Sequence, residues 1–291
     1  MSRKMLSTED RVVNTVSCLI AGVFLLMTGV PFFHVLSKAF SSETALIANR
    51  ITVYPIGFQL DTISYVLHSE LFNTSFMNSI LVTLLGTVLS LLVTAMGAYP
   101  LSKRKLPFSK PLTILFVFTM WFSGGTVPTY LLMRQLKLTN NLMVLILPAA
   151  INVYNMLLVK NYYQSLPEAL EESARIDGAN SFTILFRIVF PLSLPVFATI
   201  ALFLSVGLWN DYFSPMIYIT RSSLKTLPVY LRDIIVNSQA DTSMATADDV
   251  NVLPEGVRAA TIVASTVPIL VVYPFVQKYF MKGVMIGAVK G

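Results

Sequence analysis

Charged side chains are concentrated in one segment of this chain, residues 167–191, with the sequence PEALEESARIDGANSFTILFRIVFP. Three glutamates closely follow Pro167, which suits a proline at the first position of a helix and the positive end of the helix dipole. Arg175 lies four residues after Glu171 and three after Glu172, close enough to pair on a helix surface. We interpret the segment as a water-exposed docking element.

A glycine divides this segment. Gly178 tolerates the left-handed backbone that commonly ends a helix, and Asn180 or Ser181 can cap a second helix that starts at Phe182. The expected shape is therefore helix, glycine turn, helix. The second helix carries an apolar stripe that suits a membrane interface or another protein, although an ordinary amphipathic loop helix has the same pattern. The stripe consists of Phe182, Leu185, Phe186 and Val189.

Catalytic and metal-binding motifs are missing from the sequence. It contains neither a G-x-x-x-x-G-K-[ST] phosphate loop nor a G-x-S-x-G nucleophile elbow. Cys18 has no disulfide partner, and with His34 and His68 it does not have the spacing of a zinc site. The sequence also lacks a basic stripe with interleaved aromatic residues, the pattern that would indicate nucleic-acid binding. We expect no catalytic residue, no metal and no cofactor bound by this chain.

The composition indicates a membrane protein. Of the 291 residues 55% are hydrophobic and 12% charged, with a mean hydropathy of +0.69. Apolar windows long enough to cross the bilayer recur, too many for one soluble core of this length. The sequence predicts an all-α, polytopic membrane protein with one transmembrane domain over residues 1–291. The six predicted spans are approximately 12–37, 76–102, 111–133, 138–160, 188–213 and 259–278.

The distribution of basic residues predicts the topology. Six spans leave both termini on one side, and more than half of the 21 Lys and Arg residues fall on that side, including KRK at 103–105. The positive-inside rule makes it the cytoplasm. The docking segment, 164–190, is then an inside loop, and the loops 38–75 and 221–258 are external. The external loops could form small structured caps or, for the acidic part at 240–256, a flexible linker.

The docking segment resembles the EAA loop of binding-protein-dependent ABC importer permeases. The pattern of that loop is EAA, then three residues, a glycine, nine residues and I-x-LP. Ser173 replaces the central alanine of that pattern, and Phe190 replaces the leucine before the proline. The string ARIDGA at 174–179 is typical of the sugar-importing branch. The matching residues, with Asp177 beside them, are Glu172, Ser173, Ala174, Gly178, Ile188 and Pro191.

The resemblance extends over essentially the whole chain. WND at 209–211 and the tail QKYFMKGVMIGAVKG are similar to the carbohydrate-uptake permease related to the second subunit of maltose transporters. AYPLSKRKLP at 98–107 and FSGGTVPTYLL at 122–132 are similar to permeases for complex oligosaccharides, including aldouronate- and alginate-type importers. The resemblance implies the type I ABC importer permease fold and a multi-pass protein of the bacterial cytoplasmic (inner) membrane.

The resemblance also implies partners. A separate dimer of ABC ATPase subunits binds ATP and Mg, a second permease completes a heterodimer, and an external solute-binding protein delivers an oligosaccharide. Membrane lipid surrounds the spans. Glu172, Asp177 and Gly178 would then form the coupling helix that sits in a cleft of the ATPase. Capping of the following turn is the alternative role for Asp177.

Polar residues at membrane depth are candidates for the sugar path, because each would be costly facing lipid. Interhelical hydrogen bonding or interfacial anchoring is the alternative for each, and we favour it. The candidates are Asn78, Tyr130, Asn152, Tyr154, Asn155, Trp209, Asn210 and Asp211.

A secondary transporter working without an ATPase is the alternative function. Such a protein usually carries coupling carboxylates inside its spans and a repeated architecture. The apolar windows 12–37, 71–102, 111–133, 138–159 and 259–277 contain no Asp, Glu, Lys or Arg, and no inverted repeat is clear in the sequence. These observations favour the ABC importer subunit.

Overall fold

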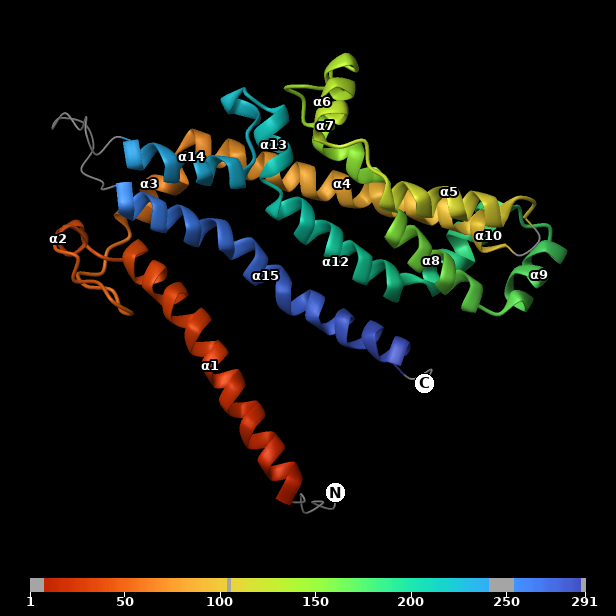
Figure 1. The fold of residues 1–291 in the computed structure, drawn as a ribbon, viewed down its shortest axis with the longest axis horizontal. Helices are drawn as coiled ribbons and strands as arrows, with labels where there is room; N and C mark the ends of the chain where they lie inside the picture. Colours follow the sequence, from red (N-terminus) through yellow and green to blue (C-terminus); the bar gives the residue numbers. More distant parts are fainter. Residues whose placement is uncertain (1–7, 104–105, 241–253, 289–291) are drawn as a thin grey trace. The chain divides into compact units, whose positions relative to one another are not determined.

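The computed structural model describes residues 8–103, 106–240 and 254–288, with side chains for residues 12–103, 106–236 and 254–271 (Figure 1). Helices dominate these residues, and none of them is in a β-strand. The chain divides into two compact units, one from residues 1–69 and 231–267 and the other from residues 70–230 and 268–291. The predicted all-α class is therefore confirmed for the described residues.

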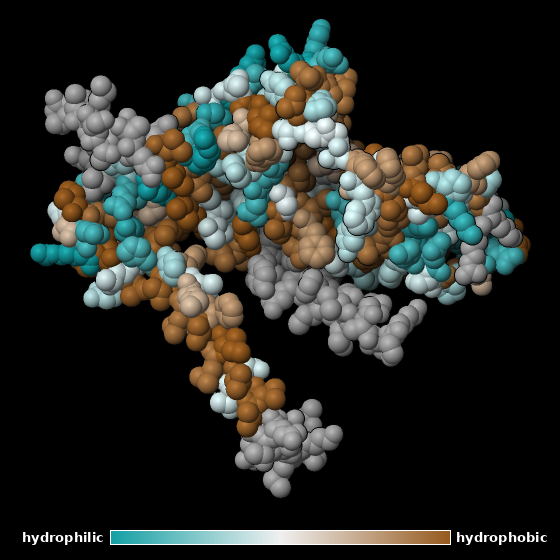
Figure 2. All heavy atoms as spheres, in the orientation of Figure 1, coloured by the Kyte–Doolittle hydropathy of each residue, from teal (hydrophilic) through white to brown (hydrophobic). Residues whose placement is uncertain are grey.

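The first unit contains α1 (Thr8–Ala39), α2 (Glu43–Ile47) and α3 (Asp61–His68), with most of α14 (Leu227–Ala240) and the start of α15 (Pro254–Ala288). Within Val12–Ala39 of α1, a window of 18 residues has a mean hydropathy of 2.2. Figure 2 shows hydrophobic side chains along this helix. Such an exposed apolar surface requires lipid or another protein to cover it.

Residues 38–68 of the first unit form a small structured cap. Ala45, Leu46 and Ile51 make its buried cluster, and the rings of Phe40 and Phe58 stack with centroids 5.6 Å apart. In the same unit the Lys38 ammonium pairs with Glu255 at 2.6 Å. Residues 38–68, within the loop predicted at 38–75, are therefore structured. The acidic residues 241–253 of the other loop lie outside the described residues.

The second unit is built around α4 (Glu70–Ser102), which packs against α12 (Leu194–Asn210) and α8 (Val153–Ser165). Buried side chains from these helices and from residues 174–189 form one core. The remaining elements of the unit are α5 (Ser109–Trp121), α6 (Thr126–Gln135), α7 (Met143–Ile146), η1 (Pro148–Ala150), α9 (Glu168–Ile176), α10 (Ser181–Ile184), η2 (Leu185–Val189), α11 (Phe190–Leu192), α13 (Phe213–Tyr218) and η3 (Ser222–Leu224).

Several of the predicted spans are bent helix pairs. By length and composition, α1 and α4 are each sufficient to cross a membrane among the described residues. The pair α5 and α6 bends by 108°, the pair from Met143–Ala150 to α8 by 41°, and the pair from Ser181–Leu192 to α12 by 80°. Counting each pair as one span gives up to five. The sixth predicted span, 259–278, falls within α15, whose side chains are described only to residue 271.

The break in the third predicted span, 111–133, follows from its residues. The helix α5 has 13 residues, a rise of about 20 Å, which is shorter than the hydrocarbon core of about 30 Å. Gly125 then adopts φ +81°, a conformation that glycine takes without steric cost, and α6 begins at the next residue. The residues 111–133 are therefore two helices and not a single straight one.

Small residues allow the helices of the second unit to approach closely. A Cβ atom added at Gly86 of α4 would lie 2.8 Å from Cδ1 of Leu208 on α12. At Gly97 it would lie 3.2 Å from the sulfur of Met156 on α8. Both glycines face helices that pack directly on α4. Close helix contact through small residues is the usual way in which helices associate in lipid.

We expect Gly86→Val to destabilise the protein by about 1–3 kcal/mol, because the added side chain overlaps Leu208. Gly207→Val is the matched control, since a Cβ atom added at this position of α12 meets no atom within 4 Å. Thermal unfolding of the two purified variants in detergent, followed by size-exclusion chromatography, measures the difference. Equal transition temperatures for both variants would show that this contact is not tight.

Candidate functional site

The candidate site is the docking segment, residues 164–190, together with the end of α4 against which it packs. From here on we call this segment the coupling loop, after the loop that it resembles. Its first helix, α9, begins after Pro167, whose backbone is extended with ψ 124°. Pro167 makes no side-chain hydrogen bond that caps the helix. Ala174 is buried in the core of the second unit. Glu172, Ser173 and Asp177 are exposed. One face of α9 is therefore attached to the protein, and the other is open.

The turn after α9 is a Schellman motif. The amide of Gly178 donates to the carbonyl of Arg175 at 3.0 Å, and the amide of Ala179 donates to that of Ala174 at 2.9 Å. These two bonds need a left-handed residue between them, and Gly178 supplies it with φ +80°. The predicted glycine turn is confirmed.

Asn180, and not Ser181, caps the second helix. Its side-chain oxygen accepts a hydrogen bond from the amide of Thr183 at 2.8 Å, and α10 begins at Ser181, one residue earlier than expected. The helix then passes through the π-helical turn η2 into α11. The predicted helix, turn, helix arrangement is confirmed, and Asn180 provides the cap that Asp177 does not.

The apolar stripe of the second helix is split between two environments. Leu185 and Val189 are buried in the core, whereas Phe182 is 65% exposed and Phe186 is 39% exposed. The π-helical turn rotates the residues that follow it relative to a regular helix. The predicted stripe is therefore divided: Leu185 and Val189 anchor the loop, whereas Phe182 and Phe186 stay exposed.

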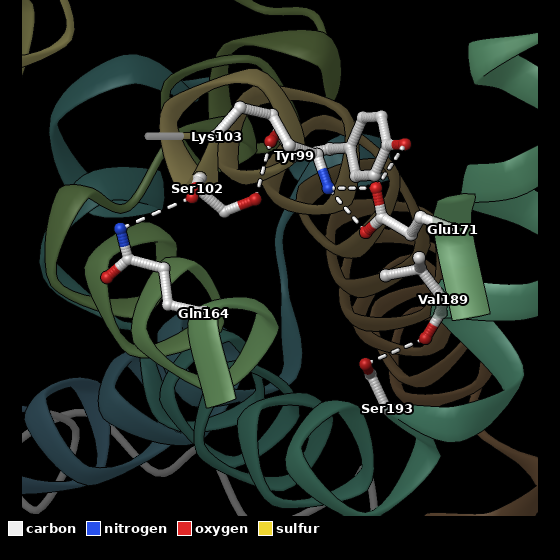
Figure 3. Close-up of polar contacts among 7 residues, drawn as sticks. All are labelled: Tyr99, Ser102, Lys103, Gln164, Glu171, Val189 and Ser193. Atoms are coloured by element: carbon white, nitrogen blue, oxygen red, sulfur yellow. Dashed lines mark hydrogen bonds and ion pairs between the residues drawn. The ribbon is translucent and has the colours of Figure 1, made fainter. Parts of the chain in front are cut away.

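A polar anchor joins α9 to the end of α4 (Figure 3). The Lys103 ammonium binds both carboxylate oxygens of Glu171, and the Tyr99 hydroxyl donates to one of them at 3.3 Å. The same ammonium lies 4.1 Å from the centroid of the Tyr99 ring, a cation–π contact. We call Tyr99, Lys103 and Glu171 the loop anchor. Its partly buried location makes the ion pair less screened than a surface pair.

Further contacts hold both ends of the loop. Before α9, the Gln164 amide donates to the carbonyl of Ser102 at 3.3 Å. After it, the Ser193 hydroxyl donates to the carbonyl of Val189 at 2.7 Å at the bend into α12 (Figure 3). Phe190 packs on Phe197 of α12 with ring centroids 4.7 Å apart. The loop is thus fixed to α4, α8 and α12, the three helices of the core.

Five exposed residues of the loop, which we call the ridge, are Glu172, Ser173, Ile176, Asp177 and Phe182. Ile176 is 82% exposed and Phe182 65% exposed, an unusual degree for apolar residues of a soluble loop. Glu172 and Asp177 add two carboxylates to the ridge. Apolar side chains between charges are suited to a protein partner, since burial of the former supplies affinity and the latter supply orientation.

The other two residues of the predicted motif lie away from the ridge. Ile188 is half-buried and packs on the core, and Pro191 lies within α11 just before the bend. The motif therefore combines residues of a contact surface with residues that shape the loop.

Sequence reasoning missed the loop anchor. The spacing along the helix allows Arg175 to pair with Glu171 or Glu172, but the Glu171 carboxylate is held by Lys103 and Tyr99. The available signal was the concentration of opposite charges on two inside segments, with KRK at 103–105 and the glutamates of α9. Arg104 and Lys105 of that run lie outside the described residues.

Most candidates for the sugar path have structural partners. Buried Asn78 donates to the carbonyls of Ser223 and Lys225 at 2.9 and 3.1 Å. Asn152 caps α8, and Asp211 accepts from the amides of Phe213 and Ser214. These contacts match the alternative favoured from the sequence, namely that such residues hold helices and turns together.

The remaining candidates differ in exposure. Asn155 is buried, Tyr130 stacks on Tyr218, and Trp209 meets Phe76 edge-on. Tyr154 and Asn210 are exposed, and the amide of Asn210 bonds only its own helix, at Val206. Of the eight candidates, these last two have side chains most available to a passing ligand.

We expect Glu171→Lys to release α9 from α4, because it places two cations in one anchor. A charge-assisted hydrogen bond is worth about 1.5–3 kcal/mol, so opening of the loop should increase about 10- to 100-fold. The rate of limited proteolysis within residues 166–180 measures it. The double variant Lys103→Glu with Glu171→Lys should recover protection, and Glu168→Lys, on an exposed position of α9, should change little. Equal cleavage rates for all variants would contradict the anchor.

The sequence of this chain is similar to those of known transport proteins. Residues 106–286 match the family model described as binding-protein-dependent transport system inner membrane component. The chain is 41% identical over 271 residues to the polygalacturonan/rhamnogalacturonan transport system permease protein YtcP of Bacillus subtilis (strain 168), covering 92% of this chain and 95% of that protein. It is also 41% identical over 282 residues to Protein LplC of the same organism, with coverage of 97% and 96%.

A solved structure of an ABC transporter is also similar to this chain. The chain superposes with a TM-score of 0.86 and 35% identity on a chain of a bacterial ABC transporter involved in the import of the acidic polysaccharide alginate, covering 95% of this chain and 99% of that one. The coupling loop lies inside the matched family region. The chain therefore belongs to the family of binding-protein-dependent transport system inner membrane components, the permeases of ABC importers.

Proposed function

We propose that this chain is the transmembrane subunit of an ATP-driven, binding-protein-dependent importer and forms half of the path for a uronate-containing oligosaccharide. The observation that carries the proposal is the coupling loop, which is fixed to three core helices and presents an exposed ridge. A separate pair of ATPase subunits would bind that ridge and hydrolyse ATP with Mg. This permease subunit would itself be non-catalytic.

The proposed mechanism is alternating access. Closure of the ATPase pair moves the ridge, and the loop anchor and the buried residues of the loop transmit that movement to α4, α8 and α12 as a rigid body. The bends between helices provide places at which the bundle can rearrange. A ligand-bound protein outside the membrane then releases its sugar into the cavity shared with a second permease.

The proposed placement is a bacterial cytoplasmic (inner) membrane, with six spans and both termini in the cytoplasm. Exposed apolar α1 and apolar α4 support it, together with the three bent pairs. The coupling loop and the basic run at 103–105 would then lie on the cytoplasmic side, where the ATPase is.

The substrate class is inferred from the relatives. Polygalacturonan and alginate, named for the two similar transporters, are acidic polysaccharides. A distant structure, 14% identical, is an alginate transporter in complex with an alginate pentasaccharide-bound periplasmic protein, and it supports only the fold here. Tyr154 and Asn210 are the residues we propose for contact with the sugar, and the partner permease would supply other contacts.

A secondary transporter is not favoured. Coupling carboxylates would have to lie within the spans, but α12 contains no Asp or Glu and α4 contains one, Glu70, at its first position. The family match concerns permeases that work with binding proteins.

Reconstitution of the complete complex with its binding protein tests the proposal. Uptake into proteoliposomes should require ATP, and an oligogalacturonate or oligoalginate should stimulate ATP hydrolysis where a neutral maltooligosaccharide does not. Stimulation by the neutral sugar alone would contradict the uronate assignment. Uptake by this chain alone, independent of ATP, would contradict the importer.

Two substitutions test the ridge and the turn. Glu172→Lys should lower ATP-dependent uptake about 10-fold or more, because it reverses a charge presented to the ATPase. Gly178→Val should do the same, since a β-branched residue does not adopt φ +80° without strain.

Matched variants serve as controls. Glu168→Lys makes the same charge change on α9 outside the ridge, and Gly178→Asn retains a residue that tolerates the left-handed region. Both controls should keep most of the uptake. Normal uptake by Glu172→Lys and Gly178→Val, with the protein in the membrane at the usual level, would remove the ridge from the mechanism.

A further inference from the structure

A cavity of about 810 Å³ lies between the end of α4, the start of α5 and α8, entirely within the second unit. Three lysines from three elements line it: Lys103 after α4, Lys110 on α5 and Lys160 on α8. Ser109 and Thr113 add hydroxyl groups to the same wall. The mechanism proposed above uses Lys103 but not the other two lysines.

The cavity has an uncompensated positive charge. Glu171 neutralises Lys103, and it is not itself part of the lining. The Lys160 ammonium donates to the Thr113 hydroxyl at 3.2 Å, a neutral partner. Within the described part of the chain, no carboxylate lies within 4.0 Å of Lys110 or Lys160. Two cations thus face one space in which an anion would replace water, and the start of α5 adds the positive end of a helix dipole.

The same cavity has an apolar wall. Phe108 is 77% exposed and Ile114 is 68% exposed, and both line it. The helix α5 has no buried residue along its 13 positions. A small inorganic anion would leave this wall in contact with water. A ligand with an anionic head and a hydrocarbon part covers both the lysines and the wall.

We propose that this cavity binds the phosphate headgroup of an anionic phospholipid from the inner leaflet, with its acyl chains along the exposed side of α5. The proposal rests on the placement of the coupling loop at the cytoplasmic side of the membrane. Basic pockets between helices on that side have the charge and depth of a headgroup site, and each lysine near an anionic lipid surface contributes about 1 kcal/mol. Loss of both Lys110 and Lys160 should therefore weaken binding about 30-fold.

The test is a lipid titration of the purified complex in detergent, with bound lipids counted by native mass spectrometry. The probes are a short-chain phosphatidylglycerol, the matching phosphatidylcholine and inorganic phosphate. We expect saturable binding of phosphatidylglycerol, with weaker binding of phosphatidylcholine. The double variant Lys110→Gln with Lys160→Gln should bind phosphatidylglycerol about 30-fold more weakly, while the complex stays intact.

The matched control is Arg134→Gln with Arg221→Gln, which removes the same net charge at two exposed positions away from the cavity. It should bind phosphatidylglycerol as the unmodified protein does. Equal loss in both double variants, or no preference for phosphatidylglycerol, would overturn the proposal. Inorganic phosphate that displaces the lipid at similar concentration would make the cavity a site for free anions. Because the readout is bound lipid, these outcomes do not depend on transport.

Discussion

The attachment of the coupling loop to the end of α4 is the constraint on which the rest of the second unit depends. Ala174, Ile184, Leu185 and Val189 enter the same core as the helices α4, α8 and α12. The anchor around Glu171 adds a directional contact at one corner. A loop that is bound only by apolar packing can slide, whereas a partly buried ion pair with a hydroxyl donor fixes its register. In the proposed mechanism, the ridge and the core helices therefore move together.

The exposed surfaces show what this chain lacks on its own. The helix α1 has almost no buried side chains over its apolar length, and α5 has none. Lipid and a second permease are the coverings that the proposed assembly provides for such surfaces. The contrast with α4, which combines buried small and polar residues with exposed apolar ones, follows from its central place in the core.

The polar residues of the predicted spans illustrate how a transport path and a scaffold can use the same residue types. Asn78 and Asp211 satisfy backbone groups at breaks between helices, where those groups would otherwise lack partners. Asn140, which no motif indicated, does the same with its left-handed backbone, accepting hydrogen bonds from the amides of Thr220 and Arg221. Bent spans need such residues for stability, so polarity at depth is weak support for contact with sugar.

The sequence by itself determined the helical class, the family resemblance and the shape of the coupling loop. Each depends on residues close in the chain: hydrophobic runs, a left-handed glycine at 178 and a cap at 180. Tertiary structure alone decided the pairing of Lys103 with Glu171, 68 residues apart. It also decided which apolar residues of 182–190 are buried, namely Ile184, Leu185 and Val189. The physical reason is that local backbone preferences act over a few residues, whereas helix packing determines which distant side chains meet.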